Sequence, residues 1–459
     1  MSYRCIRDLK IDDYGIRHLR IGDLNNDGYA ELVLVQCYPM NREICAVTAL
    51  DLEGNVLWQH GELLDNCNWL YSDIPVQVVD WDDDGCNEVV YVRQSYYKTA
   101  HMWCYSKGGY VDKMNPTRDE LRNDPDLATE CAFEYEGDAH LMVLDGVTGE
   151  VKQQIPIPAP ADDCMCFGHF DGTGKMNVLA KDRYWNLWAI SNEGRILWTV
   201  SDKELKKGLG HCPAVGDIDG DGLDEVFLTN TLIDSDGTVL WQIPDVHGHH
   251  DAAFILDDIA EPRIITAADK LRMVAPDGKI LWEKDGGHLQ NVHVGRYSAD
   301  PKHGPYQFWV QDDVPNAADY HEGCKILEAN ADTGGQRGTI YDWYGNRLYS
   351  EVHHERTYFI PIHWTGGDQD NLLRFTASED GHMDVIDVCG NVIDTINYPV
   401  PDGKPSSQPY WPYAADILGD SRDEIIVLSG SNISAYMNTA CHNIRRYYNY
   451  SRYQFPIPR

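Results

Sequence analysis

The sequence predicts an all-β fold, an eight-bladed β-propeller, because two short patterns alternate along its whole length. The first pattern is an apolar strand that runs into an acidic turn. The second is a hairpin with a glycine turn, usually followed by a large residue. Strands this short cannot bury their faces alone, so the repeated units must pack against their neighbours. Sheets of about four strands arranged around an axis protect their edges by closing into a ring.

The blade count follows from eight copies of the acidic-turn pattern. Three copies are complete: Ile21–Glu31 (IGDLNNDGYAE), Val78–Glu88 (VVDWDDDGCNE) and Val215–Glu225 (VGDIDGDGLDE). Five are weaker: Phe167–Val178, Phe254–Arg263, Val292–Asp300, Phe359–Asn371 and Ala414–Glu424. The hairpin pattern lies at Leu50–Trp58, Leu144–Val151, Ile190–Trp198, Ile233–Trp241, Val274–Trp282, Tyr341–Tyr349 and Ile386–Ile393. A seven-bladed propeller is the alternative count, and a parallel β-helix, which has more uniform repeats, is the main rival fold.

We expect one propeller domain over residues 1–459, with an insertion at about residues 94–140. The 39 Gly and 27 Tyr residues agree with turn-rich β structure. Aromatic residues are frequent in the insertion: Tyr96, Tyr97, Trp103, Tyr105 and Tyr110. Because aromatic side chains commonly line ligand sites, the insertion is interpreted either as a wall over one end of the channel or as an elaborated outer hairpin.

The cysteines and the apolar patterning bear on location. The first residues, MSYRCIRDLKID, show no pattern of a secretory signal, and no run of ~18 apolar residues predicts a membrane span. Thirteen cysteines without framework spacing favour thiols in a reducing compartment. The spacing of Cys164 and Cys166 is too tight for a usual zinc site. We therefore expect a cytoplasmic protein with no membrane partner.

The formal net charge of −35 argues against nucleic acid as a partner, because binding to phosphates needs clustered Lys and Arg. Part of the charge lies in the three complete acidic turns, where oxygen ligands at positions 1, 3 and 5 and a glycine at position 6 suit Ca²⁺. The last acid comes at position 9, so the loops are not EF-hands. The predicted ligands are Asp23, Asn25, Asp27, Glu31, Asp80, Asp82, Asp84, Glu88, Asp217, Asp219, Asp221 and Glu225. The five weaker copies are interpreted as turns without an ion.

Histidine, arginine and lysine residues precede the inner strands expected in the C-terminal half. In a propeller these positions gather at one end of the central channel, the usual binding surface. They are His211, His249, His250, His288, His293, Arg356 and Lys404. Because several occupy equivalent places in successive blades, we predict a binding or catalytic site at that end.

These segments resemble the rhamnogalacturonan lyases of polysaccharide lyase family 11, which are eight-bladed calcium-binding propellers. GGHLQNVHVGRYSADP is similar to the family's G-H-G-D-A-x-H-V-G-D-x-D-P motif, and KPSSQPYWPYAADILGDSRDEI to G-T-K-x-x-P-x-x-x-A-D-x-x-G-D-W-R-E-E. GHHDAAFILDD and ERTYFIPIHW resemble N-H-N-x-x-V-A-D and G-R-G-x-x-A-D-I. The likeness covers about residues 208–450. The chain departs from the motifs at Leu289, Gln290, Asn291, Arg296 and Ser421.

The resemblance implies β-elimination on rhamnogalacturonan-type glycans, with an acidic oligosaccharide as substrate. By position, the catalytic residues are His250 (or His249), His288, Arg356 and Lys404, and the substrate-binding residues are His211, His249, His293 and Tyr358. Arginine suits the uronate carboxylate, and a His or Lys suits removal of the C5 proton. Two alternatives stay open: a propeller glycoside hydrolase for rhamnosyl-uronate linkages, and a non-catalytic calcium-dependent binding module.

Overall fold

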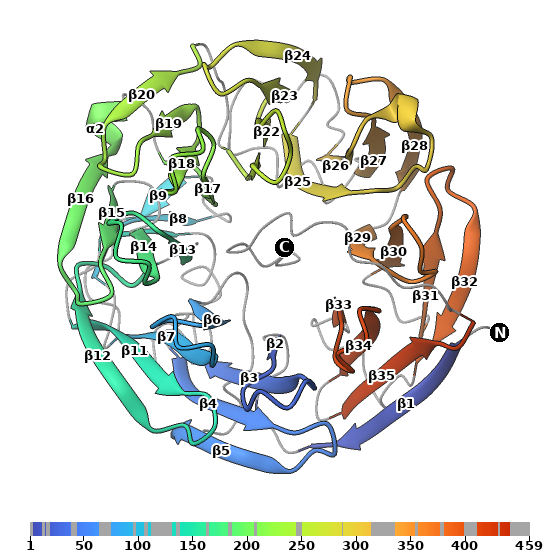
Figure 1. Cartoon of the computed structure of the whole chain (residues 1–459), viewed down its shortest axis with the longest axis horizontal. Coiled ribbons are helices and arrows are strands. Elements are labelled where there is room, and N and C mark those ends of the chain that lie inside the picture. The colour runs from blue at the N-terminus through green and yellow to red at the C-terminus, as the bar shows by residue number, and fades with distance from the viewer. Residues whose placement is uncertain are drawn as a thin grey trace.

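The chain folds into eight four-stranded antiparallel sheets around one axis, as the computed structural model shows (Figure 1). It describes residues 3–11, 14, 19–37, 44–63, 75–94, 98–104, 109–111, 131–134, 138–161, 165–181, 186–205, 209–244, 250–286, 288–313, 336–353, 357–376, 381–398, 411–429 and 432–440. The predicted eight-bladed β-propeller is confirmed, and the seven-bladed alternative is excluded.

Each blade runs from an inner strand near the axis to an outer strand at the rim (Figure 1). The strands of the first four blades, from inner to outer, are β2 (Leu19–Gly22), β3 (Glu31–Cys37), β4 (Ile44–Leu50) and β5 (Val56–Gly61); β6 (Val76–Val79), β7 (Glu88–Gln94), β11 (Ala139–Asp145) and β12 (Val151–Ile157); β13 (Cys166–Gly168), β14 (Asn177–Lys181), β15 (Asn186–Ile190) and β16 (Ile196–Ser201); β17 (Ala214–Gly216), β18 (Glu225–Leu228), β19 (Thr231–Ile233) and β20 (Val239–Gln242).

The remaining four blades follow the same order. Their strands are β21 (Ala252–Leu256), β22 (Arg263–Ala267), β23 (Lys270–Val274) and β24 (Ile280–Asp285); β25 (His288–Gly295), β26 (Gln307–Asp313), β27 (Gln336–Tyr341) and β28 (Arg347–His353); β29 (Thr357–Ile362), β30 (Asn371–Thr376), β31 (His382–Ile386) and β32 (Val392–Asn397); β33 (Trp411–Ala415), β34 (Glu424–Ser429), β35 (Asn432–Asn438) and β1 (Tyr3–Lys10).

The eighth blade closes the ring. Its outer strand, β1, comes from the N-terminal part of the chain and pairs antiparallel with β35. The acidic-turn pattern joins the first strand of a blade to the second, and the hairpin pattern joins the third strand to the fourth. Because β1 and β35 are far apart in the sequence, the eighth blade has no such hairpin. This accounts for eight acidic turns but seven glycine hairpins.

Burial follows the position of a strand within its blade. Every residue of β3 is buried, because a second strand is covered by neighbouring blades on both faces. On the outer strand β5 the burial alternates, and Trp58 is its one buried residue. The apolar middle strands therefore form the core between blades, and outer strands contribute single large side chains.

A repeated hydrogen bond joins neighbouring blades at the rim. The indole N–H of Trp58 on β5 donates to the carbonyl oxygen of Gly146, in the hairpin turn of the next blade, at 2.8 Å. Equivalent bonds run from Trp198 to Ser235 (2.7 Å), from Trp241 to Pro276 (2.8 Å) and from Trp282 to Trp343 (2.9 Å). In two blades without this tryptophan, another side chain of the outer strand donates the bond. Gln153 donates to the carbonyl oxygen of Asn192, and Arg7 donates to that of Leu52, both at 2.8 Å. In these six blades, a side chain of the outer strand thus ties the blade to the next.

The glycine of the hairpin turn leaves room for this side chain. Gly149 has a φ of +69°, and a Cβ there would lie 2.5 Å from the Trp58 ring. Gly237, with a φ of +89°, has the same relation to Trp198, at 2.6 Å. A side chain at either glycine would clash with the indole and strain the backbone. The glycine of one blade and the tryptophan of the blade before it therefore depend on each other.

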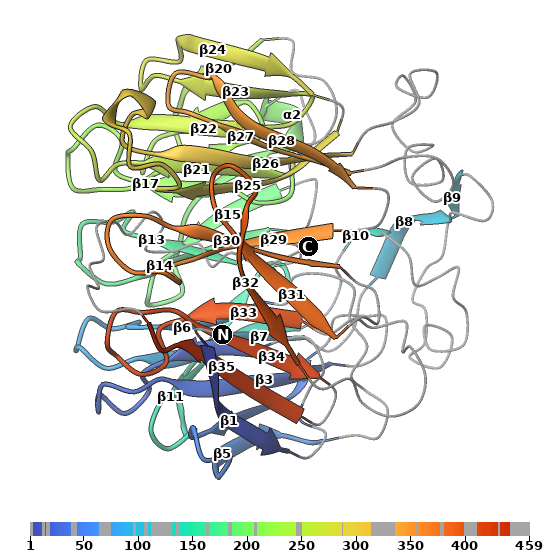
Figure 2. The same cartoon turned by 90° about the vertical axis from the view of Figure 1, so that its right-hand side faces the viewer.

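A separate three-stranded sheet lies between β7 and β11 in the sequence. It consists of β8 (Lys98–Cys104), β9 (Gly109–Val111) and β10 (Cys131–Glu134), in the order β10-β8-β9. Strands β8 and β9 lie beyond one end of the blades (Figure 2). Much of the expected insertion at 94–140 falls outside the described residues. In the part of the chain that the structure describes, no helix is long and apolar enough to cross a membrane.

Replacing Trp198 by phenylalanine tests the rim hydrogen bond. The Trp198→Phe change keeps a buried ring but leaves the carbonyl oxygen of Ser235 without its donor, so we expect a loss of about 1–3 kcal/mol in the free energy of unfolding. Urea denaturation measures it. Trp188→Phe, on the half-buried face of β15, is the control and should cost less. Equal stability of the two variants would contradict the role of the rim bond.

Candidate functional site

The topology separates two groups of candidate residues at opposite ends of the blades. The acidic turns connect the end of each inner strand to the start of the second strand. The predicted catalytic residues precede or begin the inner strands, so they belong to the other end. Strand β8 follows β7, a second strand, and projects from that same end, which is called the catalytic end after the residues predicted there (Figure 2).

The first carboxylate of each complete acidic turn fixes the loop. In the third turn, Asp217 accepts hydrogen bonds from the backbone N–H groups of Asp221 (3.1 Å) and Gly222 (3.0 Å). Asp23 and Asp80 accept the corresponding bonds in the other two turns. The short acidic segments fold back on themselves because the aspartate at position 1 satisfies the backbone donors of the turn.

The glutamate at position 9 accepts a backbone hydrogen bond from each loop. One oxygen of Glu225 accepts the backbone N–H of Ile218 at 2.9 Å, and Glu31 and Glu88 do the same for Leu24 and Trp81. Glu225 is 1% exposed. Burial, together with the negative charges of the nearby aspartates, raises the pKa of Glu225 to about 8. A cation bound nearby would stabilise the ionised form of this buried carboxylate.

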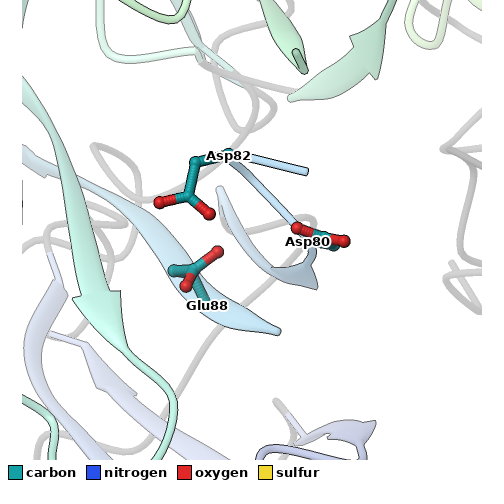
Figure 3. A group of neighbouring side chains, drawn as sticks. All are labelled: Asp80, Asp82 and Glu88. Atoms are coloured by element: carbon teal, nitrogen blue, oxygen red, sulfur yellow. The ribbon is translucent and has the colours of Figure 1, made fainter. Parts of the chain in front are cut away.

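Two of the three complete turns bring carboxylates close enough to hold a metal ion. The groups are Asp80, Asp82 and Glu88, and Asp217, Asp219 and Glu225, with ligand oxygens within 4.8 Å of one another. Figure 3 shows the first group, in which the carboxylates of Asp82 and Glu88 point toward each other. Carboxylate oxygens are the kind of ligand that a hard cation prefers. The close approach of carboxylates that the predicted metal sites require is thereby present in these two turns.

The first complete turn has a different arrangement. Asn25 occupies position 3 and donates from its side-chain amide to Glu31, at 2.9 Å. An ion bound to this oxygen of Glu31 would have to displace the amide of Asn25.

The third turn faces a pocket of about 510 Å³ formed with the corresponding turn of the next blade. Asp217 and Asp219 line one side, and Asp257 and Asp258 line the other. The backbone N–H of Asp217 donates to Asp257 at 3.1 Å, which links the two turns. The third turn thus has two further carboxylates, from the next blade, beside its own.

At the catalytic end, the structure brings His211 and His250 together. The backbone N–H of His211 donates to the carbonyl oxygen of His250 at 2.7 Å, which joins two adjacent blades. The His250 ring is fully buried, with its Nε2 2.9 Å from the Thr266 hydroxyl and its edge toward Phe227. Direct proton transfer between His250 and a substrate stays a prediction, because this ring lies below the surface.

Sequence reasoning missed two charged residues beside this pair. Asp251 is 4% exposed, and its carboxylate lies 3.6 Å from Nε2 of His211. Lys181, at the end of β14, is fully buried and donates to the carbonyl oxygen of Gly210 at 2.6 Å. Asp251 follows His250 directly, which is a local signal, whereas Lys181 comes from a different blade and only the fold reveals it.

Two further predicted substrate-binding residues are buried among aromatic rings. His293 stacks on Trp309, with ring centroids 5.4 Å apart, and hydrogen-bonds to the backbone of Phe359. Burial lowers the pKa of His293 to about 4. Tyr358 stacks on Phe375, with centroids 5.4 Å apart. Both side chains pack against neighbouring strands, and their contact with substrate stays a prediction.

The other predicted site residues are described only in part or not at all. His288 is the first residue of β25, so its backbone lies at the catalytic end. His249, Arg356 and Lys404 lie outside the described residues. Their assignment stays a prediction that rests on the sequence.

The fold and the acidic loops define the protein as an eight-bladed β-propeller with candidate metal sites at the end opposite the histidines. The chain is similar to rhamnogalacturonan exolyase YesX of Bacillus subtilis (strain 168), with 23% identity over 94% of this chain and 72% of the relative. It is also similar to rhamnogalacturonan endolyase YesW of the same organism, with 24% identity over 68% of this chain and 54% of the relative. No protein-family profile matches the chain.

Solved structures give the same likeness in fold. The crystal structure of rhamnogalacturonan lyase YesW covers 98% of this chain and 77% of its own, with a TM-score of 0.63 and 19% identity. Rhamnogalacturonan lyase PL11 of Bacillus licheniformis covers 97% of this chain and 77% of its own, with a TM-score of 0.61 and 20% identity. The expected resemblance to rhamnogalacturonan lyases is confirmed.

The buried imidazole of His293 predicts sensitivity to acid. Its folded pKa of about 4 lies below the ordinary value of 6.5, so the native state binds fewer protons than the unfolded chain between those values. The stability from this group is present above pH ~6.5 and is lost as the pH falls toward ~4, by about 3 kcal/mol. Urea midpoints measured across this range should fall less steeply for His293→Gln than for the wild type. Parallel profiles would contradict the assignment.

Proposed function

We propose that the protein is a polysaccharide lyase that cleaves rhamnogalacturonan-type glycans by β-elimination. The observation that carries the proposal is the similarity to rhamnogalacturonan exolyase YesX over 94% of this chain. The fold supports it, because the inner strands of the C-terminal half bring His211, His250 and the start of β25 to one end of the ring. The substrate would be an acidic oligosaccharide that contains rhamnose and uronate.

The reaction needs a clamp for the uronate carboxylate, a base and an acid. Arg356 would pair with the carboxylate through two parallel hydrogen bonds, with Lys404 beside it, and so acidify the C5 proton. A base removes that proton, the electron pair forms the C4–C5 double bond, and the C4–O bond breaks. The leaving oxygen takes a proton from an acid. We assign base or acid to His288, with His250 as its partner.

We further propose that Ca²⁺ binds the third acidic turn. The four donors Asp217, Asp219, Asp221 and Glu225 are oxygen ligands of the kind that Ca²⁺ prefers. One oxygen of Glu225 holds Ile218, while the other, Oε1, is buried without a hydrogen-bond partner among the described residues. A bound cation would satisfy this oxygen and stabilise the loop, far from the catalytic end.

Absorbance distinguishes elimination from hydrolysis. Elimination leaves a double bond conjugated to the carboxylate, which absorbs in the near ultraviolet, whereas hydrolysis yields reducing ends without that chromophore. We expect absorbance to rise with rhamnogalacturonan oligosaccharides, and His288→Ala and Arg356→Ala to lower the rate at least ~100-fold with unchanged melting. Reducing ends without absorbance would contradict the proposal in favour of a hydrolase, and binding without product would favour a non-catalytic module.

Removal of calcium tests the proposed ion. A ligand that binds the native state stabilises it by mass action, about 2.7 kcal/mol at a hundredfold excess over Kd. We therefore expect EDTA to lower the melting temperature without abolishing the fold, and added Ca²⁺ to restore it. Glu225→Gln is the matched control, because its amide oxygen can still accept from Ile218 but carries no charge. An unchanged melting curve, with no calcium by elemental analysis, would contradict the site.

A further inference from the structure

The acidic turns differ in the partner of one oxygen. In each of the three complete turns, Oε2 of the position-9 glutamate accepts a backbone N–H within the loop. The other oxygen, Oε1, contacts the amide of Asn25 in the first turn, at 2.9 Å, and Lys152 in the second, at 2.6 Å. Among the described residues, Oε1 of Glu225 in the third turn has no hydrogen-bond partner. The position that a cation would fill is thus not equivalent in the three loops.

Lys152 reaches into the centre of the second turn. Its Nζ lies 2.6 Å from Glu88, 3.0 Å from Asp82 and 3.8 Å from Asp84. These are three of the four side chains predicted to ligate calcium there. Glu88 is 1% exposed on its side chain, so this ion pair is anchored at its buried end.

The geometry of the outer strand explains why Lys152 points at the loop. The pairing of β11 with β12 skips Lys152: Val143 pairs with Gln153, and Leu144 pairs with Val151. Lys152 is therefore the extra residue of a β-bulge, which redirects a side chain out of the regular alternation. The same skip in the fourth blade falls on Leu240, between Val239 and Trp241.

Most blades carry an apolar residue at the bulge position. These residues are Leu57, Leu197, Leu240, Leu281, Leu348 and Ile393. The cation therefore occurs in a blade whose acidic turn is complete, at a position where an apolar residue is the rule. The third turn is equally acidic but has Leu240 in the corresponding place.

We propose that the ammonium group of Lys152 is a built-in cation of the second acidic turn and takes the place of a bound Ca²⁺ there. A calcium ion on Asp82 and Glu88 would lie within a few ångströms of Nζ, where two like charges repel strongly. The second turn is then calcium-independent, while the third turn depends on the ion. The inference extends the proposed calcium site and is independent of lyase activity.

A reciprocal exchange tests the proposal. The probe is Ca²⁺ alone, titrated by calorimetry into the full-length protein after EDTA treatment. Lys152→Leu should bind one more Ca²⁺ per chain than the wild type, and Leu240→Lys should bind one fewer. Lys152→Gln serves as a second variant if Lys152→Leu does not fold, and thermal melting monitors folding in each case.

The outcomes separate the two proposals. A folded Lys152→Leu or Lys152→Gln protein with wild-type stoichiometry would overturn the role of Lys152, whatever the third turn does. If the wild-type protein binds no Ca²⁺ at the third turn, and Leu240→Lys does not change the stoichiometry, the proposed calcium site is contradicted. Even then, a gain of one Ca²⁺ in Lys152→Leu would support Lys152 as the internal cation of the second turn. Ultraviolet absorbance with oligosaccharide reports the lyase reaction separately.

Discussion

A hydrogen bond from the outer strand of one blade to the hairpin turn of the next holds the ring at its rim. Trp58, Trp198, Trp241 and Trp282 donate it, and Gln153 and Arg7 take the same role where tryptophan is absent. The donor is largely buried, so it must find an acceptor, and the acceptor lies in a turn whose glycine leaves space for the ring. Among the described residues, this bond links six of the eight blades to their neighbours.

The ring keeps two kinds of chemistry apart. The acidic turns lie at the ends of the inner strands, and the histidine-bearing segments lie at the beginnings. A chain with a net charge of −35 repels an anionic glycan over most of its surface. Arg356 and Lys404, the cationic residues predicted at the catalytic end, would offset this repulsion where the substrate binds. Cations at the opposite end, whether Ca²⁺ or Lys152, would neutralise carboxylates that serve the fold.

The sequence was sufficient to predict the fold because its signals are local. An acidic turn or a glycine hairpin spans about ten residues, so each copy marks a blade without knowledge of the others. Closure by β1 and β35 joins residues from opposite ends of the chain, and no local pattern indicates that pairing. Lys152 and Glu88 are also far apart in the sequence, and their contact depends on a bulge between two strands of the blade. No local pattern therefore indicates this contact.

The candidate site was harder to predict than the fold. Position along the chain correctly placed His211 and His250 near each other, because equivalent positions of successive blades meet at one end. It gave no information on depth, and the burial of His250 and His293 follows from packing against Phe227 and Trp309. Lys181 was missed because it carries no motif and meets Gly210 only through the packing of adjacent blades.

Elimination and cation binding are proposed to occupy opposite ends of one ring. A crystal structure with Ca²⁺ and an uncleaved acidic oligosaccharide, recorded with anomalous scattering, would locate both ligands. We predict the sugar at the end where β21, β25 and β29 begin, an anomalous peak among Asp217, Asp219 and Glu225, and the Lys152 ammonium in the second turn. A sugar bound at the acidic turns, or a calcium ion on Asp82 and Glu88, would contradict the account.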